Sequence, residues 1–126
     1  MIALELHVLE EQLSVHRFAS TSKIPEQVFT SNFFTISKTE DELSIVCDAI
    51  IQLDAEQSED GWSAIKVVGP LDFSLVGILA NLSSILAQAD ISIFAISTFD
   101  TDYILVKTEQ LNLAMETLVA AGHMKE

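Results

Sequence analysis

The segment at residues 69–78, Gly-Pro-Leu-Asp-Phe-Ser-Leu-Val-Gly-Ile, could bind a small charged molecule. It joins a run of β-branched residues to apolar residues at helical spacing, so it leads from a strand into a helix. The first amide groups of a helix lack partners within it and, with the helix dipole, accept a carboxylate or a phosphate. Asp72 lies beside them and can pair with an ammonium group. Together these features match both ends of a free α-amino acid.

A plainer interpretation of the same segment is a capped turn. Asp72 or Ser74 would then satisfy the helix amide groups itself, as Asp and Ser commonly do at this position. Gly77 would allow tight packing only, rather than the approach of a ligand or a second backbone. Both interpretations stay open from the residues alone. The binding site expected under the first one comprises Asp72, Phe73, Ser74, Leu75, Val76, Gly77 and Ile78.

A second polar group, Ser-Thr-Phe-Asp-Thr-Asp at residues 97–102, falls between two apolar runs. The hydroxyl and backbone groups of its first two residues could line the same pocket, and its two carboxylates could hold a cationic side chain. The alternative is ordinary turn chemistry, because Asp, Ser and Thr readily bond to their own backbone. A calcium loop is disfavoured because the glycine and the distal glutamate of an EF-hand are missing. The ligand-binding residues expected here are Ser97, Thr98, Asp100, Thr101 and Asp102.

No arrangement typical of catalysis or of metal binding accompanies these residues. His7, His16 and His123 are scattered, without acidic partners at metal-ligand spacing, and His16 is expected at the surface of a strand. Cys47, the single cysteine, excludes an internal disulfide and is expected to be a buried apolar filler. A glycine-rich phosphate loop and a nucleophile elbow are both missing. We therefore expect no catalytic residue, no metal and no cofactor.

Composition narrows the class of protein. The chain has 126 residues, of which 49% are hydrophobic and 20% charged, which predicts a folded chain rather than a disordered one. Six Lys and Arg residues against 19 Asp and Glu residues argue against binding to nucleic acid or to an anionic membrane. No apolar run approaches the ~20 residues of a membrane span, and the N-terminus lacks the basic start of a signal peptide. We expect a cytoplasmic protein.

The elements that would position these residues are clearest in the second half of the chain. Apolar periodicity and turn residues predict a strand, a helix, two strands and a second helix. Their ranges are 62–68, 75–89, 91–97, 103–107 and from Thr108 to a C-terminal cap at Gly122. This order is that of a ferredoxin-like βαββαβ unit without its last strand.

The first half repeats part of this pattern. Displaced by 60 residues, Phe34, Ile36 and Val46 align without a gap with Phe94, Ile96 and Val106, which predicts a second hairpin. A strand is expected at 13–18, and residues 20–30, broken by Pro25, allow only a short turn or a one-turn helix.

Two segments decide how the halves connect. The polar stretch 54–61 is expected to be a linker or loop between domains 1–61 and 62–126. Residues 2–8 alternate apolar and polar side chains, which is typical of a strand. We expect this strand to be exchanged into the second half, where it would complete the sheet.

Residues 62–67, Trp-Ser-Ala-Ile-Lys-Val, and 91–106, Ile-Ser-Ile-Phe-Ala-Ile-Ser-Thr-Phe-Asp-Thr-Asp-Tyr-Ile-Leu-Val, resemble ACT domains. They are most similar to the paired ACT domains of the CASTOR arginine sensors and to small bacterial tandem ACT-domain proteins. The resemblance is stronger over 62–107 than over 13–48. It implies an α+β fold of two ferredoxin-like repeats with antiparallel sheets and helices on one face, the first repeat being degenerate.

The resemblance also implies a function. It indicates a regulatory module, not an enzyme, that binds a free amino acid at an interface between ACT units. The negative net charge favours neutral or basic amino acids over acidic ones. The alternative is a protein–protein interaction module with a vestigial pocket. A homodimer is the default assembly, and the regulated enzyme or regulator is not indicated.

Overall fold

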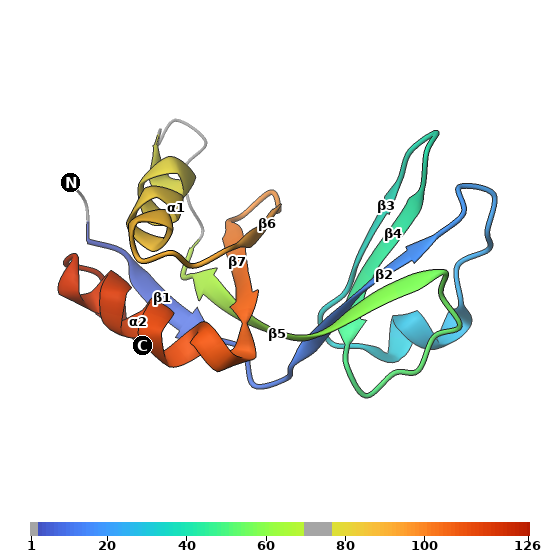
Figure 1. The fold of residues 1–126 in the computed structure, drawn as a ribbon, viewed down its shortest axis with the longest axis horizontal. Coiled ribbons are helices and arrows are strands. Elements are labelled where there is room, and N and C mark those ends of the chain that lie inside the picture. Colours follow the sequence, from blue (N-terminus) through green and yellow to red (C-terminus); the bar gives the residue numbers. More distant parts are fainter. Residues whose placement is uncertain (1–2, 70–76) are drawn as a thin grey trace. The chain divides into compact units, whose positions relative to one another are not determined.

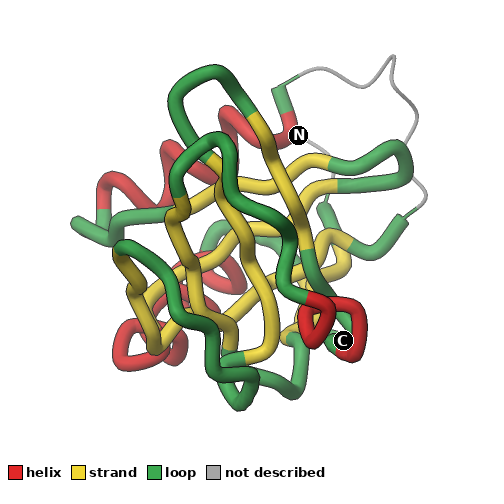
Figure 2. Tube along the Cα trace, turned by 90° about the vertical axis from the view of Figure 1, so that its right-hand side faces the viewer, coloured by secondary structure: helices red, strands yellow, loops and turns green. Residues whose placement is uncertain are grey.

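Two compact units make up the chain. The structure is a computed structural model that describes residues 3–69 and 77–126 (Figure 1). Unit 1 comprises the described residues up to Glu10 together with those from Ser63 to Glu126, and unit 2 comprises Glu11–Trp62. Figure 2 distinguishes the helices, strands and loops along the same trace.

Unit 1 is an α+β unit with a mixed sheet. Its strands follow the order β6-β7-β5-β1-β8, in which β1 is antiparallel to β5 and parallel to β8. The strands are β1 (Glu5–Val8), the second half of β5 (Gln57–Val67), β6 (Phe94–Ser97), β7 (Asp102–Lys107) and β8 (Met124–Lys125). The helical segments are α1 (Ile78–Gln88), η2 (Thr108–Gln110) and α2 (Leu111–Ala120).

The core of unit 1 lies between its sheet and its two helices. Alternate residues of the strands, such as Leu6, Ile65 and Val67, pack against residues of both helices, such as Leu82 and Leu118. In Figure 1 the helix α2 runs alongside β1. Because successive strand residues point to opposite faces, the residues between these core positions face away from the helices.

Unit 2 is built mainly of strands. Its sheet has the order β3-β4-β2-β5, and one face covers the buried cluster that includes Phe18, Val28, Ile45 and Cys47. The elements are β2 (Leu13–Phe18), η1 (Glu26–Thr30), β3 (Thr35–Lys38), β4 (Leu43–Asp48) and the first half of β5. The thiol of Cys47 is fully buried, as expected, and this burial raises its pKa.

Most of the expected elements are present. Each unit pairs a hairpin, β3–β4 or β6–β7, with the strand that precedes it in sequence. The N-terminal strand pairs as expected: β1 lies against β5 with Leu6 opposite Val67, which places this segment in unit 1. Gly122 has φ +109°, in the left-handed region that suits a helix C-terminus.

Two expectations about the strands are wrong. The polar stretch 54–61 is not a linker throughout, because Gln57–Gly61 belongs to β5 and pairs with β2, with Ser58 opposite His16. The strand expected to be missing at the C-terminus exists as the two-residue β8, beside β1. Residues 57–61 were not predicted as a strand because most of their side chains are polar. The strand β8 was not predicted because it has only two residues.

The surface position expected of His16 is also wrong, because this residue is only 4% exposed. Its strand β2 pairs with β4 on one side and with β5 on the other, so it has no free edge. His16 shares the face of Phe18, which packs into the core of unit 2. The ring is accommodated by a hydrogen bond between its Nδ1 and Ser58 Oγ, at 2.7 Å.

Candidate functional site

The turn between β6 and β7 carries the second group of expected site residues. Ser97 lies opposite Asp102, and Ser97 Oγ donates a hydrogen bond to Asp102 Oδ1 at 2.5 Å. Thr98 N–H donates to the carbonyl of Thr101 at 2.8 Å, and Thr101 N–H donates to Thr98 Oγ1 at 3.3 Å. These hydroxyls therefore close the turn on itself, which is the plainer chemistry expected of Ser and Thr.

Thr101 also fixes the turn to the neighbouring strand. Its side chain is buried, and its Oγ1 donates a hydrogen bond to the carbonyl of Val67 at 2.5 Å. Val67 is the last residue of β5, and Lys66 directly precedes it. The turn and the end of β5 are thus held side by side by a hydrogen bond remote in sequence.

A polar hollow of about 160 Å³ lies between the turn and the end of β5. Three of the expected binding residues line it, and three residues outside the expected binding sets complete it. The lining consists of Lys66, Gly69, Thr98, Asp100, Thr101 and Tyr103. The alternation along β5 held a signal for Lys66, because it is the one charged residue in the apolar run 62–68.

The hollow carries two opposite charges that nothing neutralises among the described residues. Lys66 is half-buried and Asp100 is exposed, and neither side chain makes a hydrogen bond or an ion pair within residues 3–69 and 77–126. An ammonium group can hold a ligand carboxylate, and a carboxylate can hold an ammonium or guanidinium group. The arrangement can therefore bind a zwitterion, and it offers no nucleophile with an adjacent base.

The first group of expected residues is described only in part. Asp72, Phe73, Ser74, Leu75 and Val76 lie outside the described residues. The side chain of Ile78, at the start of α1, packs against the core of unit 1. Asn81 N–H donates to the carbonyl of Gly77 at 2.8 Å, as expected at the first turn of a helix.

The backbone conformation of Gly77 gives a structural reason for a glycine at this position. Its φ is +80°, a left-handed conformation that residues with a Cβ adopt at a cost. A Cβ atom at position 77 would have no described atom within 4 Å. Close approach of a second backbone is therefore not the reason for a glycine here. The backbone turn into α1 is what requires it.

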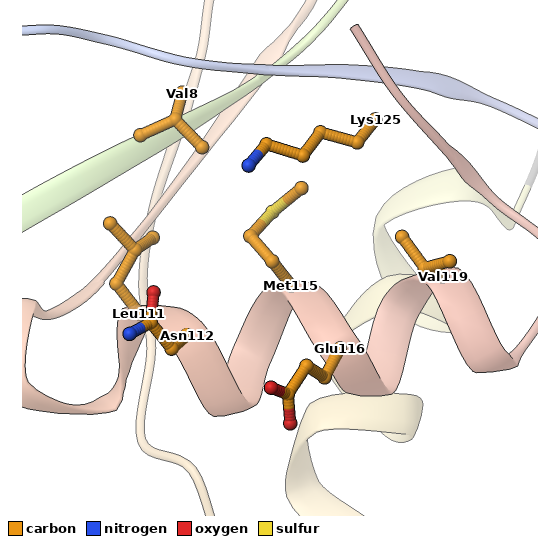
Figure 3. A pocket seen from close by; sticks show the side chains of 7 residues that line it. All are labelled: Val8, Leu111, Asn112, Met115, Glu116, Val119 and Lys125. Atoms are coloured by element: carbon orange, nitrogen blue, oxygen red, sulfur yellow. The ribbon is translucent and has the colours of Figure 1, made fainter.

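A second hollow in unit 1, of about 380 Å³, lies along α2 and contains none of the expected site residues. Figure 3 shows the thioether of Met115 between α2 and the side chain of Lys125. The lining consists of Val8, Leu111, Asn112, Met115, Glu116, Val119 and Lys125. Its floor is mainly apolar, with one cation and one carboxylate among the lining residues.

The described residues lack the features of a metal site and of a membrane-spanning helix. Residues 3–69 and 77–126 hold no group of three or more His, Cys, Asp or Glu side chains placed to bind a metal ion. Within the same ranges, no helix is both long enough and apolar enough to span a membrane.

Solved structures resemble this chain over its whole length. The crystal structure of an Agobacterium tumefaciens protein is 34% identical, with a TM-score of 0.92, and the match covers 100% of this chain and 94% of that one. The ligand-free regulatory subunit of aspartate kinase from Thermus thermophilus is 10% identical with a TM-score of 0.66, over 93% and 96% of the two chains. This second likeness shows the fold alone.

Curated relatives of this chain share its sequence over much of its length. The human protein named cytosolic arginine sensor for mTORC1 subunit 1 is 36% identical over 108 residues, which cover 79% of this chain and 32% of the relative. The bovine protein of that name is 37% identical over 94 residues, 68% of this chain and 29% of the relative. This chain therefore spans about a third of the length of the curated relatives it matches.

Family models divide the chain near the boundary between the two units. One model, described as an N-terminal domain, matches residues 11–51. The model of the ACT domain matches residues 57–120, which include the hollow beside the β6–β7 turn. These matches confirm the resemblance that residues 62–106 indicated, and the chain belongs to the ACT-domain family.

Proposed function

We propose that the chain is a regulatory module that binds a free amino acid in the hollow beside the β6–β7 turn. The observation that supports this most directly is that one polar hollow holds two opposite charges, Lys66 and Asp100, whose side chains pair with no other described residue. Thr98 and Thr101 shape its wall, while Ser97 orients Asp102 at the base of the turn. The module would act by changing its contacts with another protein when the ligand binds, and not as an enzyme.

The strand-to-helix segment completes the proposed site. Asp72 would add a second carboxylate near the ligand ammonium group, and amide groups of Phe73, Ser74, Leu75 and Val76 would add hydrogen-bond donors near the ligand carboxylate. Gly77 and Ile78 would then begin the helix α1 behind the ligand. Following the ACT pattern, the ligand would lie at an interface between ACT units, which a homodimer would supply if residues 1–61 are a degenerate repeat.

The relatives support the ligand class. One is named an arginine sensor, and it is described as cytosolic. The net charge of −13 disfavours acidic ligands, so we propose a neutral or basic amino acid and a cytoplasmic protein. Two or three charge-assisted hydrogen bonds, offset by lost ligand freedom, give roughly micromolar to millimolar affinity.

A thermal-shift screen of the twenty L-amino acids, followed by calorimetry, tests the proposal. A ligand of the folded state stabilises it by about 2.7 kcal/mol at a hundredfold excess over Kd, so at least one amino acid should raise the melting temperature. Asp100→Asn should lower its affinity about tenfold. Glu40→Gln is the matched control, because Glu40 is the exposed acid at the equivalent position of the β3–β4 turn. No response to any amino acid would refute the proposal.

One observation favours a second function, a protein–protein interaction module. The hollow along α2 is wider and more apolar than the one beside the turn, and Val119 on its rim is 46% exposed. A partner could pack there without any small molecule. Under this alternative, Asp100→Asn would leave partner binding unchanged and no amino acid would stabilise the chain.

A further inference from the structure

We infer that Lys66 recognises the α-carboxylate of the ligand and Asp100 its α-ammonium group, so that this site selects for the amino-acid backbone and not for a side chain. The inference rests on the proposed function. It restricts the ligands to molecules that have both a free α-carboxylate and a free α-ammonium group. It predicts that molecules lacking a free α-carboxylate, such as the decarboxylated amine or the C-terminal amide of the same amino acid, are rejected.

The direction of Lys66 follows from its neighbours in β5. Ile65 and Val67 are fully buried under the helices of unit 1, so Lys66 between them faces the opposite side of the sheet. Its cross-strand neighbour in β1 is His7. His7 Nδ1 lies 3.0 Å from Glu126 Oε1, so the side-chain carboxylate of Glu126 is already engaged by another residue.

The strand β5 and one buried hydrogen bond hold Lys66 and Asp100 on the same hollow. Asp100 lies in the turn that Thr101 Oγ1 fastens to the carbonyl of Val67, next to Lys66. Lys66 and Asp100 nevertheless form no ion pair with each other. Because Lys66 and Asp100 line one hollow but do not pair with each other, a zwitterion can pair with both of them.

The size of the hollow limits what enters it. Its volume of about 160 Å³ is below the ~300–1,000 Å³ of pockets that enclose drug-sized ligands. That space suits the few heavy atoms of an amino-acid backbone, and a long side chain must leave through the open side. Selection would thus be strict for the backbone charges and tolerant of the side chain.

The first test uses the unaltered protein and matched ligands. Calorimetry would compare L-arginine with agmatine and L-argininamide, and L-leucine with isoamylamine and L-leucinamide. We expect each amino acid that binds to do so at least tenfold more tightly than its amine and its amide. Equal affinity of the amine or the amide would overturn the role of Lys66 and leave the proposed function intact. Failure of all amino acids to bind would overturn both.

The second test assigns the selection to Lys66. Lys66→Met should lower the affinity for the amino acid at least tenfold while leaving the affinity for the amine unchanged, so the ratio between them falls toward one. Lys66→Arg keeps the charge and should keep most of that ratio. Lys38→Met, at an exposed position of β3 in unit 2, is the matched control. An unchanged ratio in Lys66→Met, with its unliganded melting curve intact, would overturn the inference.

Should Lys66→Met fail to fold, Asp100→Asn keeps the inference testable, since Asp100 is exposed. This variant should bind the amino acid and the amine more weakly by similar factors, because both carry the ammonium group. Loss of affinity for the amino acid alone would contradict the assignment of the ammonium group to Asp100.

Discussion

His16 shows how a single buried side chain can make stability depend on pH. Its Nδ1 hydrogen-bonds with Ser58 Oγ, whereas its Nε2 is buried and has no hydrogen-bond partner among the described residues. Protonation would place a charge and a second N–H where no described acceptor lies. Burial accordingly lowers the pKa of His16, and the negative charge of Asp60, the smaller influence, opposes this by raising it.

The lowered pKa of His16 makes the folded chain less stable at acidic pH. A histidine whose folded pKa lies below the unfolded value of about 6.5 binds its proton more readily in the unfolded chain. Stability is therefore full above pH 6.5 and falls as the pH drops below that value toward the folded pKa. Burial also lowers the pKa of His123, in unit 1, so it contributes in the same direction.

We predict a lower melting temperature at pH 5.5 than at pH 7.5, measured by circular dichroism or calorimetry. The range stays above the ordinary pKa values of Asp and Glu, so histidines dominate the change. His16→Gln should reduce this difference, because it removes one of the two groups responsible. His7→Gln, at a partly exposed position, is the control. A difference that is the same in His16→Gln and in the unaltered protein would contradict the prediction.

At the scale of elements, the hydrogen bond between Thr101 Oγ1 and the Val67 carbonyl connects the β6–β7 turn to β5. Thr101→Val keeps the shape of the side chain but leaves a buried carbonyl without this donor, which costs about 1–3 kcal/mol. We expect urea denaturation to show this loss and calorimetry to show weaker amino-acid binding. Thr101→Ser, which keeps the hydroxyl, should restore most of both.

Thr117→Val provides the matched control for this element. Thr117 Oγ1 donates to the carbonyl of Leu113 at 2.7 Å, but this bond is exposed on the surface of α2. Water can replace an exposed donor, so its loss should change stability by less than about 0.5 kcal/mol. Equal effects of Thr101→Val and Thr117→Val would show that the bond to β5 has no special role.

The elements also show what a sequence can and cannot predict. Both hairpins and the pairing of the N-terminal strand followed from apolar alternation, because each of these strands has one face on a core. The first half of β5 was not predicted as a strand, because its residues and their partners are polar. Ser14 Oγ, for example, donates to Asp60 Oδ1 at 2.6 Å across the sheet. Hydrogen bonding between distant polar residues leaves no periodic signal.

Part of the candidate site was predictable from the sequence, namely the residues of the β6–β7 turn. Thr98, Asp100 and Thr101 stood out because hydroxyls and carboxylates gather in one turn. Lys66 did not, because its contribution depends on which strand end the turn is fastened to, and that is a long-range property of the fold. Ser97 and Asp102 satisfy each other and do not line the hollow.

At the scale of the whole molecule, net charge dominates the electrostatics. The chain has 19 acidic and 6 basic residues, net −13, so its long-range charge interactions are mainly repulsive. The ion pair between Arg17 and Glu56, at 2.6 Å, joins a permanently charged base to an acid, and both side chains are exposed. Repulsion of this kind destabilises the compact state, and salt screens it.

We predict that raising NaCl from 10 to 300 mM increases the melting temperature at pH 7.5. The Debye length falls from about 30 Å to below 8 Å over this range, which weakens repulsion between distant carboxylates more than attraction within close pairs. The same screening should weaken the binding of L-arginine more than that of L-leucine, because only the former carries a net positive charge that the acidic field attracts. Choline chloride at equal ionic strength should act as NaCl does. A melting temperature that falls with salt would mean that attractive pairs, and not the excess of carboxylates, control the stability of this chain.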